Sequence, residues 1–207
     1  MTENIRVYSQ NSIRIETEKG IVYVDPFQMK ESPKDADFIL ITHDHYDHFS
    51  PEDIRKAAGE DTVMVVPENM KDKAKEAEGF VKRTVTVKPG ISAEIDALEL
   101  ETVPAYNIKK PFHPESAGWV GYILKDGGKR IYIAGDTEDI PEMAELKDID
   151  VALLPVNQPY TMTVEQCVRA AQTIQPKVLI PYHFGNTDLT GLPALLPGID
   201  VRLRQMQ

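Results

Sequence analysis

The chain has 207 residues, of which 42% are hydrophobic and 27% are charged, and this composition is typical of one soluble globular domain. Its 33 acidic and 23 basic side chains give a net charge of −10, which repels phosphate backbones and argues against nucleic acid as a partner. The sequence contains no apolar run of the roughly 20 residues that a membrane span needs and no signal-peptide pattern, so we expect a cytoplasmic protein without a membrane partner.

The first quarter of the chain predicts β-structure. Strand-like patterns occupy residues 5–8, 13–15 and 21–24, and residues 38–42 form an apolar run typical of a strand buried on both faces. The segment His-Asp-His-Tyr-Asp-His follows this run directly, at residues 43–48. Ser50 and Pro51 then predict the start of a helix, with serine as its cap and proline at its first position.

The rest of the chain alternates between strand and helix patterns. We expect a short charged helix at 69–77, a short helix near Pro141 and a helix from Thr163 to about Gln175 that opens with a capping box. Strands are expected at 63–66, 80–87, 91–95, 98–103, 119–124, 130–134, 151–154 and 178–180, with an edge strand at 199–204. Such a chain predicts a single domain over residues 1–207, with two sheets and helices outside them.

Histidines are few and concentrated. Only five are present, and three of them, His43, His45 and His48, lie within six residues at the end of a buried strand. Since alternate residues of an extended turn point the same way, His43 and His45 can converge on one ion, whereas Asp47 and His48 can reach a second. Imidazole and carboxylate donors without thiolate suit zinc, and also manganese, iron or nickel. The segment therefore predicts a metal site.

Three segments resemble the metallo-β-lactamase superfamily. Residues 42–48 match its H-x-H-x-D-H signature, residues 131–137 look like its strand-Gly-Asp-Thr element, and residues 180–183 look like the segment that carries its final histidine. The stretch at 103–107, together with residues 111–114 and 118–122, is similar to a branch of small metal-dependent hydrolases near the ascorbate-phosphate lactonases. The resemblance implies an α/β fold, a four-layer αββα sandwich.

The resemblance also implies a set of ligands for two metal ions, for which zinc is the first candidate. It assigns His43 and His45 to metal one, assigns Asp47, His48 and His183 to metal two, and makes Asp136 the bridge. Most members place a third histidine on metal one, but this chain has Asn107 at the corresponding position. Either Asn107 or the next imidazole, His113, completes that site.

Such a pair of ions indicates a hydrolase for a small ester, lactone, amide or phosphodiester. Zinc lowers the pKa of bound water from 15.7 to about 7, and Asp47 and Asp136 are the predicted catalytic carboxylates. Lys109, Lys110 and Tyr160 are candidate substrate contacts, and Cys167 is expected to be a small core residue.

Two other functions fit the same residues. One is a mononuclear-iron oxygenase of the same superfamily, if only one ion is bound. The other is a metal-binding sensor domain without catalysis, which the presence of Asn107 in place of a histidine suggests.

Overall fold

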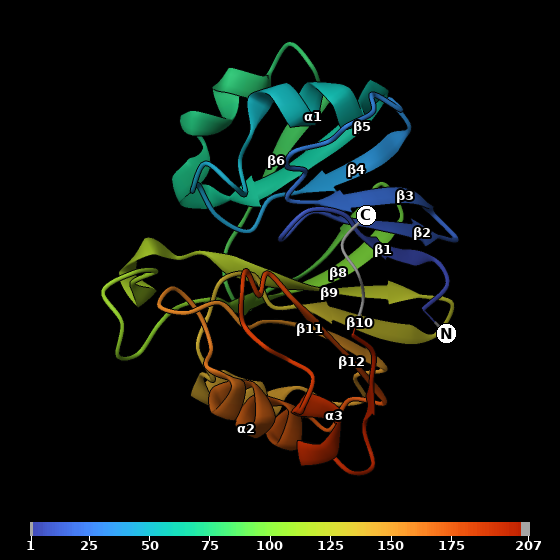
Figure 1. The fold of residues 1–207 in the computed structure, drawn as a ribbon. Coiled ribbons are helices and arrows are strands. Elements are labelled where there is room, and N and C mark those ends of the chain that lie inside the picture. The colour runs from blue at the N-terminus through green and yellow to red at the C-terminus, as the bar shows by residue number, and fades with distance from the viewer. Residues whose placement is uncertain (1, 204–207) are drawn as a thin grey trace. The chain divides into compact units, whose positions relative to one another are not determined.

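A computed structural model describes residues 2–203, which divide after residue 88 into two compact units, each built around one sheet (Figure 1). The expected single domain over residues 1–207 therefore stays a prediction. Each sheet is mixed, and helices pack on one of its faces through a hydrophobic core of its own.

The first unit contains a six-stranded sheet in the order β1-β2-β3-β4-β5-β6. Its strands are β1 (Ile5–Val7), β2 (Ile13–Thr17), β3 (Gly20–Val24), β4 (Ala36–Leu40), β5 (Ala58–Pro67) and β6 (Arg83–Val87). The strands β1, β2 and β3 pair antiparallel, and β3 to β6 pair parallel. Because β3 and β4 are parallel neighbours, the residues that follow them meet at the same edge of the sheet.

Helix α1 (Pro51–Ala57) begins where the sequence predicts it. The Ser50 side chain accepts a hydrogen bond from the backbone N–H of Asp53 at 3.3 Å, and Pro51 occupies the first turn. Ile54 on this helix packs in one core with Ile39 of β4 and Met64 of β5. The helix thereby fixes the path of the chain just after the histidine-rich segment.

The second unit contains a seven-stranded sheet in the order β13-β12-β11-β10-β9-β8-β7. Its strands are β7 (Ser92–Ile95), β8 (Leu98–Pro104), β9 (Val120–Asp126), β10 (Lys129–Ile133), β11 (Val151–Pro155), β12 (Val178–Tyr182) and β13 (Asp200–Val201). Strands β7 to β10 pair antiparallel and β10 to β13 pair parallel. Strands β8, β10, β11 and β12 therefore run in one direction, and their carboxyl ends share one edge.

Helix α2 (Val164–Ile174) confirms the predicted capping box. Thr163 Oγ1 accepts from the Gln166 N–H at 3.1 Å, and Gln166 Oε1 accepts from the Thr163 N–H at 2.8 Å. The buried face of α2 carries Cys167, which lies in the core of this unit as expected. Burial raises the pKa of the Cys167 thiol to about 12.

Some predicted elements are wrong in type or length. The helix expected at 69–77 is a pair of 3₁₀ turns, η1 (Glu68–Met70) and η2 (Lys73–Ala77), neither of which has a side-chain cap. The strand expected at 80–87 begins at Arg83, because Phe80 donates its N–H to Ala77 O at 2.9 Å and closes a turn. The short helix expected near Pro141 does begin there, as the 3₁₀ helix η4 (Pro141–Glu145).

The C-terminal region also differs from expectation. The edge strand predicted at 199–204 pairs only over Asp200–Val201, and residue 204 lies outside the described residues. The short helix α3 (Leu192–Leu195) and the 3₁₀ turn η3 (Glu115–Ala117) were not predicted. Elements of three or four residues carry too little periodicity to be recognised in a sequence.

Within the second unit, Glu101 on β8 forms a bidentate ion pair with Arg130 on β10, at 2.7 and 3.0 Å, and contacts Lys125 at 3.0 Å. The Arg130 hydrogen bonds lower the pKa of Glu101 from 4.5 to about 2. A carboxyl whose pKa falls on folding stabilises the protein above its unfolded pKa, and this stabilisation disappears as the pH falls through the folded value.

We therefore expect Glu101→Gln to lower the free energy of unfolding by about 2 kcal/mol at pH 7, with allowance for the partial exposure of the ion pair. The difference from wild type should shrink below pH 4.5 and vanish near pH 2. Urea unfolding at pH 7 and at pH 3 measures it. An equal difference at both pH values would contradict the assigned ion pair.

Candidate metal centre

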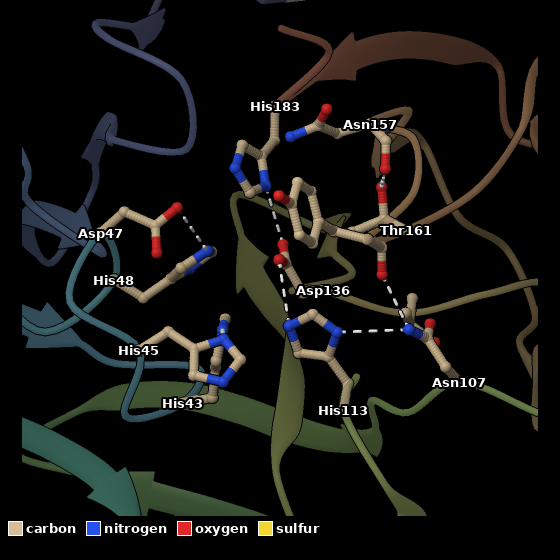
Figure 2. A network of polar contacts seen from close by, with 12 residues as sticks. His43, His45, Asp47, His48, Asn107, His113, Asp136, Asn157, Thr161 and His183 are labelled. Atoms are coloured by element: carbon tan, nitrogen blue, oxygen red, sulfur yellow. Dashed lines mark hydrogen bonds and ion pairs between the residues drawn. The ribbon is translucent and has the colours of Figure 1, made fainter. Parts of the chain in front are cut away.

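The first unit carries one set of candidate metal ligands, His43, His45, Asp47 and His48, which we call the first donor set (Figure 2). All four lie directly after β4, in a tight turn in which the carbonyl of His45 accepts from the N–H groups of His48 and Phe49, at 3.0 and 2.8 Å. The turn keeps His43 and His48 buried, whereas Asp47 stays partly exposed.

A buried carboxylate, Asp25, orients two of these imidazoles. Asp25 Oδ1 accepts from the Thr42 N–H at 2.8 Å, and Oδ2 accepts from the Thr42 hydroxyl at 2.6 Å. Asp25 Oδ2 also lies 2.7 Å from His48 Nδ1, and a carboxylate there fixes the proton on Nδ1. The lone pair of His48 is therefore on Nε2, where a metal would bind.

The same chain of hydrogen bonds sets His43. Because the Thr42 hydroxyl donates its proton to Asp25, its oxygen accepts from His43 Nδ1 at 2.9 Å, which leaves the lone pair on Nε2. His43 Nε2 lies 3.1 Å from His45 Nδ1. Two nitrogen ligands of a tetrahedral zinc ion are about 3.3 Å apart. His43 and His45 thus fit a single ion.

The sequence did not identify Asp25 as part of the site, because an Asp-Pro pair after a strand is typical of an ordinary turn. A signal was present, since Asp25 directly follows β3, the parallel neighbour of the strand that precedes the histidines. Its backbone adopts a left-handed φ of 46°, a strained conformation for a residue other than glycine. Burial raises the pKa of the Asp25 carboxyl, and His48 and Thr42 oppose that rise.

Replacing Asp25 with asparagine should weaken metal binding about 10- to 100-fold, because the amide keeps one acceptor oxygen and turns its NH₂ group toward either the Thr42 N–H or the Thr42 hydroxyl and His48 Nδ1. Competition with a chromophoric chelator measures the affinity. The matched control is Asp37→Asn, at the opposite end of β4, where the carboxylate accepts only from the Ile21 N–H in the described contacts. Equal affinities for Asp25→Asn and wild type would refute the orienting role.

The second unit carries the second donor set, His113, Asp136 and His183, which follow β8, β10 and β12 at the shared carboxyl edge of its sheet. Asp136 Oδ1 lies 2.9 Å from His183 Nδ1, and Asp136 Oδ2 lies 3.3 Å from His113 Nε2 (Figure 2). All three side chains are buried. One carboxylate thus contacts both imidazoles of this set, each with a different oxygen.

Strained backbone accompanies this set. His113 and His183 have left-handed φ values of 57° and 46°, and Gly135, which precedes Asp136, has a φ of 68°. Each such imidazole-bearing residue costs on the order of 1 kcal/mol or more, and such strain clusters at functional sites. Only a glycine adopts this conformation without cost, which explains Gly135 before the aspartate.

Asn107 is hydrogen-bonded to the segments that carry His113 and Tyr160. Its Nδ2 donates to the Tyr160 carbonyl at 2.7 Å and lies 3.2 Å from His113 Nδ1, while its backbone N–H donates to His113 O at 2.8 Å. Of the two candidates for the missing ligand, the geometry of this unit favours His113. Trp119 is buried and packs edge-on against the His113 ring at 5.7 Å.

The two lysines predicted to contact substrate differ in their surroundings. Lys109 is exposed. The Lys110 ammonium donates to the Thr161 carbonyl and to Gln166 Oε1 at 3.3 Å, and forms an ion pair with Glu138 at 3.3 Å. These contacts direct the Lys110 ammonium into the protein, so its predicted contact with substrate stays a prediction with no support from this geometry.

Glu138 is a buried carboxylate that the sequence did not single out. It accepts from the backbone N–H groups of Ile108 and Lys109, at 2.7 and 2.8 Å, and from Gln166 Nε2 at 2.8 Å. Burial raises the pKa of Glu138, but these hydrogen bonds and Lys110 outweigh it and hold the pKa below its usual value. Glu138 thus ties the segment that carries His113 to the start of α2.

Both donor sets consist of imidazole and carboxylate groups, which bind zinc, manganese, iron or nickel.

No helix among residues 2–203 combines the length and the apolar character needed to cross a membrane.

Comparison with known proteins supports a metal-dependent role. A family model described as a beta-lactamase superfamily domain matches residues 20–184. A protein of Pyrococcus abyssi, named UPF0173 metal-dependent hydrolase, is 33% identical over 187 residues, which cover 83% of this chain and 80% of the relative.

Solved structures show the same fold. A protein from Parabacteroides distasonis, whose description proposes a metal-dependent hydrolase, matches with a TM-score of 0.86 and 41% identity over 98% of this chain and 93% of its own. A metallo hydrolase of Ignicoccus hospitalis matches with a TM-score of 0.77 at 23% identity, over 97% of this chain and 94% of its own. The predicted α/β fold class, metallo-β-lactamase-like, is confirmed. The chain belongs to the beta-lactamase superfamily, among its UPF0173 metal-dependent hydrolases.

Proposed function

We propose that this chain hydrolyses a small ester, lactone, amide or phosphodiester with two divalent metal ions, for which zinc is the first candidate. In the assignment that the superfamily resemblance implies, His43 and His45 would hold one ion, Asp47, His48 and His183 would hold the other, and Asp136 would bridge them. We add His113 to the first ion as the candidate third ligand in place of Asn107. The observation that carries the proposal is the pair of ring nitrogens on His43 and His45, 3.1 Å apart, with the lone pair of His43 directed at the gap.

The chain's own residues supply positioning and proton transfer. When bound, the ions act as Lewis acids and make hydroxide available at neutral pH. Asp47 is the one partly exposed carboxylate of the first donor set, with Oδ2 at 3.9 Å from His48 Nε2. It is therefore suited to orient the attacking water and to accept its proton. Asp25 keeps His48 in the tautomer that leaves Nε2 as the ligand atom.

The partner in this proposal is a small molecule in the cytoplasm. The net charge of −10 disfavours nucleic acid, and the lone Cys167 is compatible with a reducing compartment.

The decisive experiment combines elemental analysis of the purified protein with turnover of bis-p-nitrophenyl phosphate and a lactone panel. Metal-stripped protein should be inactive, and reconstitution with zinc or manganese should restore hydrolysis with close to two ions per chain. Stoichiometric binding without turnover by any divalent ion would contradict the proposal in favour of a sensor. One iron per chain with oxygen consumption would contradict it in favour of an oxygenase.

A further inference from the structure

Two aromatic rings stand exposed together in the second unit. Phe112 lies in the segment after β8, and Tyr160 lies in the segment between β11 and α2. Their ring centroids are 5.0 Å apart in an edge-to-face arrangement with an interplanar angle of 60°. Phe112 remains 39% exposed and Tyr160 remains 45% exposed, so the pair presents apolar surface to solvent. Aromatic side chains contribute much of the binding energy where a ligand covers them, through apolar contact and offset or edge-to-face stacking.

The pair is attached to the second donor set. Phe112 directly precedes His113, whose Nε2 lies 3.3 Å from Asp136. The carbonyl of Tyr160 accepts from Asn107 Nδ2 at 2.7 Å, and the same nitrogen lies 3.2 Å from His113 Nδ1. The backbone of both residues is therefore linked to the segment of the imidazole that the proposed function assigns to a metal ion, Phe112 through the chain and Tyr160 through the Asn107 amide.

The backbone on both sides of the pair is held by hydrogen bonds. Tyr160 donates its N–H to Asn157 O at 2.9 Å, and Thr161 donates its N–H to the same oxygen at 2.7 Å. Glu138 holds the segment of Phe112 through the N–H groups of Ile108 and Lys109. Rings carried on such fixed segments lose little entropy when a ligand binds, which favours recognition of a specific shape.

The surface suits a small molecule and is too small for a protein partner. Phenylalanine and tyrosine residues each present about 200 Å² when fully exposed, so the exposed fractions leave roughly 80 to 90 Å² on each residue. A stable protein interface needs about 800 Å² per partner.

We propose that Phe112 and Tyr160 bind a flat apolar group, an aromatic ring, that the substrate carries next to the bond to be cleaved. This inference rests on the proposed function and narrows its substrate class to esters, lactones, amides or phosphodiesters that carry an aromatic group. The recognition is by apolar contact and edge-to-face stacking, so it requires no charge on the aromatic part.

The test uses two six-membered lactones that differ in the ring, aromatic dihydrocoumarin and aliphatic δ-valerolactone, together with their hydrolysis products, hydroxyphenylpropionate and hydroxypentanoate. Binding of each product to the metal-reconstituted protein is measured by calorimetry, and turnover of each lactone is measured by pH-stat. Phe112→Ala and Tyr160→Ala should each weaken binding of hydroxyphenylpropionate about three- to tenfold and leave hydroxypentanoate unaffected. The dihydrocoumarin to δ-valerolactone ratio of kcat/KM should fall by the same factor.

Three variants serve as controls. Tyr160→Phe and Phe112→Tyr keep the rings and should retain binding of the aromatic product. Leu195→Ala, which truncates a 51% exposed side chain on α3, should change nothing.

The binding data decide the inference independently of turnover. Equal losses for both products, or no binding of hydroxyphenylpropionate by wild type, would overturn it. Self-association that Phe112→Ala abolishes would also overturn it, since the pair would then be an interface between copies. Ring-dependent binding without hydrolysis of either lactone would support the inference and count against the proposed function alone.

Discussion

Replacing His48 with alanine is expected to remove bound metal and activity together. His48 is fully buried and Asp25 fixes its Nδ1, so its Nε2 is the atom left to bind a metal, and alanine removes that donor from the buried site. Loss of groups that only support a ligand costs 10- to 100-fold, so loss of the ligand itself should lower kcat/KM by at least about 100-fold. Elemental analysis and turnover of the reconstituted variant measure both effects.

Stability must be measured on the same variant, since Asp25 loses a hydrogen-bond donor and the free energy of unfolding should fall by about 1 to 3 kcal/mol. Asp44→Asn is the matched control, because Asp44 lies in the same turn and is not an assigned ligand. Wild-type metal content and rate in a folded His48→Ala protein would refute the ligand assignment.

Asp136→Asn should cause a loss of similar size. The substitution keeps the shape of the side chain but leaves one oxygen to serve two imidazoles, His113 and His183, and removes the negative charge. We expect kcat/KM to fall by at least about 100-fold and the metal content to drop toward one ion per chain. Inductively coupled plasma analysis and steady-state kinetics test the two expectations.

A matched control lies three residues further along. Asp139→Asn changes a carboxylate whose described ion pair is with exposed Arg169, so metal content and rate should stay at wild-type values. If Asp136→Asn bound two ions as tightly as wild type, Asp136 would not be the bridge.

Local patterns in the sequence were sufficient for much of the fold. The capping box at Thr163 and the serine cap at Ser50 define helix starts by hydrogen bonds within a few residues, and both helices form as predicted. The first donor set was visible for the same reason, since its four candidate ligands lie within six residues after one buried strand.

The parts of the site that the sequence did not reveal depend on contacts between residues far apart in the chain. Asp25 acquires its role from Thr42 and His48, and Glu138 acquires its role from residues about 30 positions away on either side. The choice between Asn107 and His113 also depends on a distant group, the carbonyl of Tyr160 that takes the amide of Asn107. No periodicity or spacing encodes such pairs.

The burial of Cys167 has a practical consequence. A thiol whose pKa is about 12 remains protonated at neutral pH and resists alkylation, and the chain has no other cysteine. A cysteine introduced at an exposed position such as Leu195 would then react alone with a maleimide dye or spin label. One or two cysteines can therefore be introduced at chosen positions and labelled without removal of the native thiol. Spectroscopy on such labelled protein can measure the separation of the two units in solution.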